Sequence, residues 1–318
     1  MQPLQNSGLR TESITDIVTN VQKNMRSSPV TADEDFVSFD CVSMYDFLTV
    51  ELGIYCIGLR AMELQQKSGR VFNLSALEQA IRICYEEGVC YKDKMFKQKS
   101  GAPTGHPISS AMQNVIMSTY ETEIYAKYIT SKAISLYDRW VDDTLVRVKS
   151  GVYDTILLEL NEFDPSGGLK FTIEKPTPSA DAAWKNLDFL DFSIRWAVDS
   201  ELPVNFNTRV YRKATAAKTV KPWADYGPAS WKVGTLVWFL RRAVSHSSDH
   251  HMMHEEFQFL KAQFTRAGYP ISLIDTKINQ TQTHMLGYGQ VKKDSEEQLS
   301  NTWIVLHLPW SGEAADKG

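Results

Sequence analysis

The sequence predicts an α+β fold, in which helices and antiparallel strands follow one another along a chain of 318 residues. Three observations support this fold class. Segments with apolar residues at helical spacing are interspersed with segments in which apolar and polar residues alternate. No internal repeat or low-complexity tract interrupts them. The hydrophobic fraction of 43% and the charged fraction of 23% are typical of a folded globular protein and exclude a disordered chain.

Apolar residues at helical spacing predict the helices. In Thr11–Met25 the residues Ile14, Ile17 and Val21 lie on one helical face. Pro107 marks another helix start, because proline lacks the N–H that the first helical turn leaves unpaired in any case. The predicted helices are Thr11–Met25, Leu52–Gln66, Leu74–Glu87, Pro107–Tyr120, Val152–Glu162, Ser230–Ser245, His254–Ala267 and Ile271–Asn279.

Alternating apolar residues predict the strands of an antiparallel sheet. Asp35–Phe39 forms a short strand that ends at Asp40. Ile134–Val148 forms a hairpin whose tight turn carries both Asp142 and Asp143. The other predicted strands are Tyr91–Lys99, Leu169–Glu174, Leu187–Trp196 and Val204–Arg212. Beyond Pro228 the pattern is helical, which predicts a small helical second unit.

The chain lacks the signals of a secreted or membrane protein. Its apolar runs are much shorter than the roughly 20 residues of a membrane span. The first ten residues lack the basic and then apolar order of a secretory signal. Cys41, Cys56, Cys84 and Cys90 form no CxxC pair, which favours free thiols in a reducing compartment. We therefore expect an intracellular protein with no membrane partner.

The charge distribution is uneven. A net charge of −4 argues against a general polyanion binder. The segment Asn205–Arg242 is nevertheless basic and carries interleaved aromatic residues, which predicts either a nucleic-acid surface or a solvated helix face. Its basic residues are Arg209, Arg212, Lys213, Lys218, Lys221, Lys232, Arg241 and Arg242. We expect Tyr226, Trp231, Trp238 and Phe239 to form the core of the helical unit, and His246, His250, His251 and His254 to be solvated helix-capping residues rather than metal ligands.

Three aspartates occur at positions that the pairing of strands in a sheet can bring close together. Asp40 follows one strand, and Asp142 and Asp143 lie at a hairpin turn, each within an apolar stretch. Carboxylates forced together repel one another unless cations hold them, and Mg²⁺ prefers oxygen ligands. The pattern therefore indicates a divalent-metal site, whereas a solvated strand end and a polar turn are the alternative.

Three segments then resemble, in the same order, the core palm motifs of reverse transcriptases. They are Phe39–Tyr45, Gln98–Ser109 and Arg139–Asp143. Further blocks are similar to palm and thumb blocks of Penelope-like element reverse transcriptases, and these are Leu169–Glu174, Leu187–Asp191, Val210–Lys213 and Ala267–Pro270. The resemblance extends from about Phe36 to Ile278.

The resemblance implies a right-hand polymerase palm followed by a helical thumb. The implied units are a palm with a fingers remnant in residues 1–225, a thumb in 226–280 and a C-terminal tail in 281–318. Only 39 residues precede Asp40, so most of the family's fingers region is missing. The implied function is RNA-directed DNA synthesis in a retroelement, with an RNA template, a DNA primer and deoxynucleoside triphosphates as partners. A non-catalytic nucleic-acid-binding remnant of such a polymerase is the alternative.

The resemblance also implies roles for individual residues. Asp40, Asp142 and Asp143 match the catalytic acids that bind two Mg²⁺ ions, for which Mn²⁺ is a substitute. Tyr45 matches the ring that excludes a ribose 2′-OH, the group that distinguishes RNA from DNA precursors. The residues implied beside the nucleotide are Tyr45, Gln98, Gly101 and Gly105. Those implied beside primer and template are Leu187, Phe189, Leu190, Arg212 and Lys213.

Overall fold

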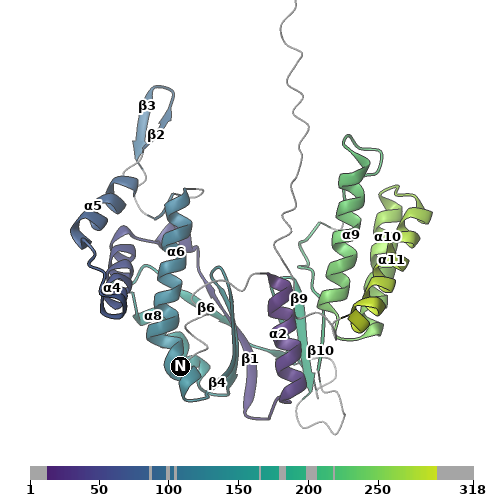
Figure 1. Ribbon diagram of the computed structural model, residues 1–318, viewed down its shortest axis with the longest axis horizontal. Helices are drawn as coiled ribbons and strands as arrows, with labels where there is room; N and C mark the ends of the chain where they lie inside the picture. Colours follow the sequence, from purple (N-terminus) through teal and green to yellow (C-terminus); the bar gives the residue numbers. More distant parts are fainter. Residues whose placement is uncertain are drawn as a thin grey trace, which may run out of the picture.

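The computed structural model describes residues 13–85, 88–97, 101–103, 106–164, 166–178, 184–197, 206–217 and 219–291. The described chain contains two four-stranded antiparallel sheets flanked by helices, which confirms the predicted α+β class. In Figure 1 a helix layer and a helical bundle stand at opposite ends of the molecule, with the two sheets between them. No helix within the described ranges is both long and apolar enough to cross a membrane.

The first sheet is built around strand β1, Glu34–Cys41. Its strand order is β4-β5-β1-β6, and β1 pairs antiparallel with both neighbours. The other strands are β4 Ile134–Trp140, β5 Asp143–Lys149 and β6 Phe171–Glu174. Because successive side chains of a strand point to opposite faces, Val37 and Phe39 enter one hydrophobic core while Phe36 enters another.

A layer of helices covers the face of the first sheet that carries Val37 and Phe39. Residues such as Ile116 and Ile156 complete this core from the helical side. The helices are α3 Met44–Phe47, α4 Val50–Ser68, α5 Leu74–Tyr85, α6 Pro107–Tyr120, the π-helix η1 Glu121–Tyr125, α7 Ala126–Thr130 and α8 Tyr153–Glu162. A hairpin of β2 Gly88–Tyr91 and β3 Lys94–Lys97 projects beyond α5 (Figure 1).

The second sheet and helix α2, Ile14–Ser27, cover the other face of the first sheet. Phe36 of β1 packs edge-on against Trp196 with ring centroids 5.2 Å apart. The strands are β7 Thr177–Pro178, β8 Trp184–Phe189, β9 Phe192–Ala197 and β10 Phe206–Val210, in the order β10-β9-β8-β7. The expected single strand Leu187–Trp196 is therefore two strands, because the chain turns at Leu190, whose φ is 51°.

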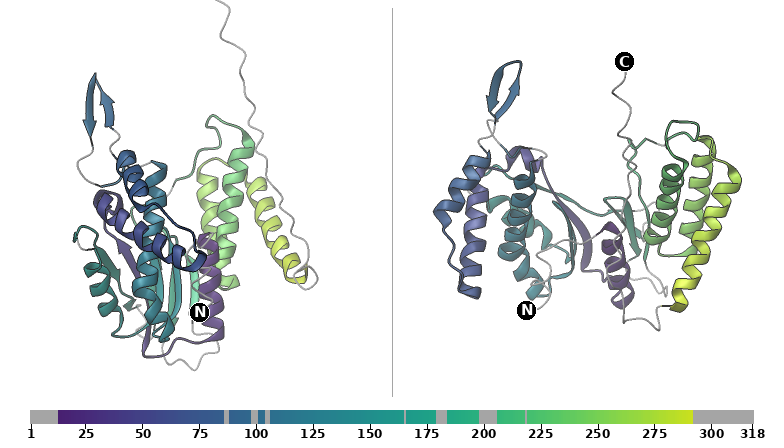
Figure 2. Two further views of the ribbon diagram at one scale, coloured as in Figure 1. Left: turned by 60° about the vertical axis from the view of Figure 1, so that its left-hand side comes forward. Right: turned by 45° about the horizontal axis from the view of Figure 1, so that its top comes forward.

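Three helices form a bundle with a core of its own, and Figure 2 shows them side by side. They are α9 Ala229–His246, α10 His250–Arg266 and α11 Ile271–Val291. Leu240, Phe257 and Phe264 lie in the core between them. The predicted end of the last helix at Asn279 is wrong, because α11 continues to Val291 across the expected boundary at residue 280. Helical backbone hydrogen bonds can continue through a polar stretch that the apolar periodicity no longer marks.

Helix α2 is attached to the first sheet through a buried carboxyl group. Asn20 donates a hydrogen bond of 2.8 Å from Nδ2 to Oδ1 of Asp138, and Oδ2 of Asp138 is buried with no hydrogen-bond partner among the described residues. Burial, and to a lesser degree the charge of Asp16, raises the pKa of Asp138 to about 7, although the bond from Asn20 opposes this. The ionised carboxylate is therefore the less favourable form at this site.

We expect Asp138→Asn to stabilise the protein at pH 8 by about 1–3 kcal/mol, because it removes a buried charge while the amide oxygen still accepts the hydrogen bond of Asn20. The pKa of Asp138 in the folded protein, about 7, lies above its ordinary value of 3.8. The free energy of unfolding of the wild type therefore falls as the pH rises between these two values. Urea unfolding at pH 4 and pH 8 measures the difference. Asp154→Asn, at an exposed position, is the control. An increase in the free energy of unfolding of Asp138→Asn that is equal at both pH values would contradict the explanation.

Candidate active site

The three predicted acids lie where β1 meets the β4–β5 hairpin. Phe39 pairs with Thr144, so the next residues, Asp40 of β1 and Asp143 of β5, are neighbours across the sheet. Their side chains share the face that also carries Phe36 and Leu145. Asp142 lies in the adjoining turn. The antiparallel register thus brings together residues that are far apart in the sequence.

The three carboxylates interact strongly with one another. Burial, the charges of Asp142 and Asp40 and a hydrogen bond with Asp40 raise the pKa of Asp143 to about 7. Burial also raises the pKa of Asp142, and the Asp40 charge adds to this effect. Asp40 itself is solvent-exposed, which leaves the cluster open on one side. The three acids therefore behave as one half-buried anionic cluster.

The donor chemistry of this cluster fits a hard divalent cation. All its donors are carboxylate oxygens, and their mutual repulsion in a partly buried setting is the condition that a bound cation relieves. Among the described residues no three His, Cys, Asp or Glu side chains are already arranged around a common metal position. The metal role of the acids stays a prediction.

The hairpin turn differs from the prediction in one respect. Trp140 pairs with Asp143, so the two turn residues are Val141 and Asp142, while Asp143 is the first residue of β5. The tightness of the turn explains the difference, because a two-residue loop leaves no room for a third residue. Val141 has a φ of 60°, a left-handed conformation that is unfavourable for a β-branched residue. The turn that carries Asp142 is therefore strained.

Tyr45 lies on the helical side of the same strand end. Its hydroxyl donates a 2.6 Å hydrogen bond to Oε1 of the buried Gln113 on α6. Gly101 lies against the Tyr45 backbone with a φ of 77°, and a Cβ there would come within 2.4 Å of the Tyr45 carbonyl oxygen. Ala102 donates its N–H to that oxygen at 2.7 Å. Only glycine fits at 101, so the loop is held closely on Tyr45. Gln98 and Gly105 lie outside the described residues.

The residues predicted beside primer and template occupy different environments. Leu187 and Phe189 are buried in the core between the sheets, and Leu190 forms the β8–β9 turn. Arg212 is paired with Glu256 of α10 and its guanidinium lies 4.2 Å from the Phe259 ring centroid. Lys213 is exposed, and its charge acts to lower the pKa of Asp143 against the stronger effects that raise it. Lys213 is thus near the acids, whereas Arg212 joins the second sheet to the bundle.

Several basic residues of the segment Asn205–Arg242 serve inside the protein. Lys232 is buried and donates to the carbonyls of Trp223, at 2.6 Å, and Asp225. Arg242 forms a 2.8 Å ion pair with Asp191. The basic side chains of this segment that remain exposed are Arg209, Lys213, Lys221 and Arg241, and Lys218 lies outside the described residues. Counting charges along the sequence could not separate the internal basic residues from the exposed ones. The acidic partners of Arg212 and Arg242 are distant in sequence, and Lys232 is held by backbone carbonyls.

Two expectations for the helical unit are wrong. Trp231 is 66% exposed and Trp238 is 56% exposed, so these aromatic residues lie on the surface of α9 instead of forming its core, which aliphatic residues such as Leu240 fill. Tyr226 is likewise exposed, whereas Phe239 packs partly buried against the core. His246 is not solvated: it is buried, with Nε2 2.9 Å from Oδ1 of Asp191.

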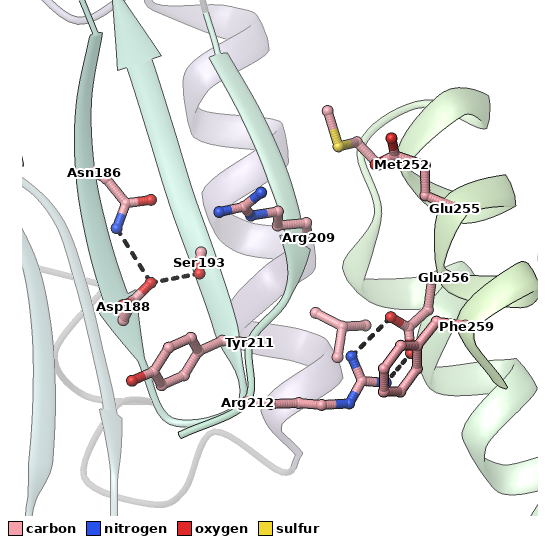
Figure 3. A pocket seen from close by; sticks show the side chains of 11 residues that line it. Asn186, Asp188, Ser193, Arg209, Tyr211, Arg212, Met252, Glu255, Glu256 and Phe259 are labelled. Atoms are coloured by element: carbon pink, nitrogen blue, oxygen red, sulfur yellow. Dashed lines mark hydrogen bonds and ion pairs between the residues drawn. The ribbon is translucent and has the colours of Figure 1, made fainter. Parts of the chain in front are cut away.

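A cavity of about 460 Å³ lies between the second sheet and α10, as Figure 3 shows. Arg209 and Tyr211 line its sheet side, and Glu256 and Phe259 line its helical side. None of the three acids lines it. The Arg212–Glu256 pair closes one end of this cavity and fixes the position of α10 against the sheet (Figure 3).

Two solved structures share the fold. Telomerase from Candida albicans, solved in complex with a TWJ fragment of telomeric RNA, matches with a TM-score of 0.56 at 13% identity over 89% of this chain and 50% of that chain. The insertion-loop deletion mutant of the RNA-dependent RNA polymerase of a human picobirnavirus matches with a TM-score of 0.50 at 11% identity over 90% of this chain and 52% of that chain. The chain thus has a polymerase palm-type fold and spans about half the length of each.

A family model described as an animal helix-turn-helix domain matches residues 226–279, which include α9, α10 and the first part of α11. Comparison with curated proteins finds no match. The fold and the helix-turn-helix match are therefore the two points that the comparisons establish.

Glu121 and Arg139 were not singled out by sequence reasoning, although both are buried next to the hairpin. Arg139 is the last basic residue before Asp142 and Asp143 and lies on a strand with buried neighbours. This position was the one feature of the sequence that could have marked Arg139 as part of the site. The partner of Arg139 could not be found in this way, because Glu121 lies on a different element.

We expect Val141→Gly to raise the free energy of unfolding by about 0.5–1 kcal/mol. Glycine adopts a positive φ without strain, and this gain exceeds the entropy that it adds to the unfolded chain. Equilibrium urea unfolding measures the change. Val141→Ala is the matched control, because alanine keeps most of the strain; an equal gain in both variants would show that backbone strain is not the cause.

Proposed function

We propose that this chain is the palm and thumb region of an RNA-directed DNA polymerase of the Penelope-like retroelement group. The observation that carries the proposal is the cluster of Asp40, Asp142 and Asp143 at the edge of a palm-type sheet. Bundle α9–α11 is the thumb in this proposal. The RNA template and the DNA primer lie between the palm sheet and the bundle, and the reaction joins a deoxynucleotide to the primer 3′ end.

The chain's own residues have separate tasks in this reaction. The carboxylates of Asp40, Asp142 and Asp143 would hold two Mg²⁺ ions, and bound Mg²⁺ would supply activation of the primer hydroxyl and neutralisation of phosphate charge. In this proposal the Tyr45 ring, held by its hydrogen bond to Gln113, excludes a ribose 2′-OH. Gly101 lies against the Tyr45 backbone and so helps to fix the segment from which the ring projects. Lys213 meets a phosphate near Asp143.

The helix-turn-helix match supports nucleic-acid binding by the bundle. In helix-turn-helix proteins the second helix commonly enters the major groove. Here the second helix, α10, exposes Glu255, whose charge repels phosphates, while Glu256 is paired with Arg212. Helix α9 presents Trp231, Trp238 and Arg241 to solvent instead. We therefore assign the nucleic-acid contact to α9, through its exposed aromatic rings and Arg241.

We expect Asp142→Asn to reduce Mg²⁺-dependent primer extension on an RNA template by at least about 10²-fold, because it removes one charged group that stabilises the transition state. The variant should fold as well as the wild type, since the change relieves carboxylate repulsion. A single-nucleotide extension assay, with thermal unfolding beside it, measures both. Asp138→Asn, on the same hairpin but outside the cluster, is the matched control and should extend normally. Wild-type protein without extension activity would refute the enzymatic proposal.

We also expect the protein to bind an RNA–DNA duplex with an affinity that falls steeply with salt concentration, since phosphate counterions are released. Lys213→Gln and Arg241→Gln should each weaken binding and each reduce the slope of log K against log salt by about 1. Lys261→Gln, on α10, should change neither. A fluorescence anisotropy titration at several salt concentrations provides the measurement, and salt-independent binding would exclude the proposed phosphate contacts.

A further inference from the structure

Arg139 is a buried side chain that joins a helix to the turn carrying Asp142. Its Nε donates to Oε1 of Glu121 at 2.7 Å, and its Nη1 donates to the carbonyl oxygen of Val141 at 2.7 Å. The side chains of Arg139 and Glu121 are 6% and 4% exposed. One planar guanidinium thus connects η1 with the β4–β5 turn inside the protein.

The helix end that supplies Glu121 is itself unusual. Glu121 begins the π-helix η1, which follows α6 without a break. A π-turn contains an additional residue, and such turns are frequent at functional sites. Tyr137 of β4 also donates its hydroxyl to Oε1 of Glu121 at 2.8 Å. Tyr125 at the other end of η1 packs on the Tyr137 ring with centroids 4.9 Å apart. The π-turn therefore holds Glu121 directly against the hairpin.

Both the buried pair and the turn are energetically costly. A buried ion pair seldom stabilises a fold more than apolar residues of equal volume would. A positive φ at Val141 is strained, and such strain persists only where surrounding contacts enforce it. Val141 precedes Asp142, and its carbonyl oxygen is the atom that Arg139 holds. The two costly features thus meet at the residue beside the candidate metal ligand.

A second buried arginine on the same hairpin makes a useful comparison. Arg147 pairs with Glu34 and donates to the carbonyl oxygens of Ser28 and Pro29, at 2.6 and 2.7 Å. These contacts attach β5 to the segment after α2 and do not touch the turn. Arg139 and Arg147 are thus alike in being buried and paired with a glutamate. They differ in that only Arg139 binds the turn that carries Asp142.

We infer that Glu121 and Arg139 are positioning residues that hold the Val141–Asp142 turn and so set the place of the Asp142 carboxylate beside Asp40. This inference rests on the proposed polymerase function for its catalytic consequence. Its structural content, the restraint of the turn through the Val141 carbonyl, is independent of that function. Neither residue touches the substrate in this assignment.

The test compares Arg139→Lys with Arg147→Lys in the full chain. Lysine keeps the charge, but its single ammonium on a flexible stem does not reproduce the fork that reaches Glu121 and Val141 together. We expect Arg139→Lys to speed amide hydrogen exchange across residues 140–144 by at least about tenfold, since one restraint on the turn is lost. It should also weaken Mn²⁺ binding to the protein by at least about tenfold, and lower kcat for primer extension by a similar factor with little change in KM for the nucleotide. Arg147→Lys should lower stability and leave all three readouts at the turn unchanged.

Glu121→Gln tests the other half of the pair. It retains an acceptor oxygen for Arg139 and should recover most of the protection from exchange, whereas Glu121→Ala should behave like Arg139→Lys. Normal exchange and normal Mn²⁺ affinity in Arg139→Lys would overturn the inference, as would equal effects in Arg147→Lys. Absence of primer extension by the wild type would instead refute the proposed function, and hydrogen exchange would still decide whether the pair restrains the turn.

Discussion

The pairing of β1 with β5 is the constraint on which the rest of the structure depends. Strand β1 is buried along most of its length and contributes side chains to two cores on opposite faces. Its register against β5 decides which residues enter each core, because a shift by one residue would exchange the faces. The same register brings Asp40 next to Asp143. Core packing and the candidate active site are therefore specified by one set of backbone hydrogen bonds.

Buried charges in this protein occur at the joints between elements. Burial alone would raise the pKa of Asp191, but a hydrogen bond from His246 and the charge of Arg242 outweigh it and keep this pKa below its usual range. Together with the Arg212–Glu256 pair, this joint fixes α9 and α10 against the second sheet. Partnered charges of this kind specify geometry more than they add stability.

The acid cluster is the contrasting case, because among the residues that the structure describes none of its carboxylates forms an ion pair, although the charge of Lys213 acts on Asp143. The charge of Asp40 raises the pKa of Asp142, and the charges of both raise the pKa of Asp143. The surrounding sheet holds the three side chains together in spite of this repulsion. Because these repelling carboxylates lie at the solvent-facing ends of two central strands, the site attracts cations strongly. The strain at Val141 adds to the cost at the same place.

The sequence by itself determined the α+β class, most of the helices and the hairpin with its acids, since these follow from local periodicity and turn chemistry. The resemblance singled out Gly101 as a residue beside the nucleotide, and the structure adds its close contact with the Tyr45 backbone. Only the tertiary structure decided that Arg212, Lys232 and Arg242 are used internally, that Trp231 and Trp238 are exposed, and that Glu121 meets Arg139. The physical reason is that periodicity records which face of an element is apolar. The partner of a charge or an aromatic ring depends on contacts between distant segments, which the local pattern does not encode.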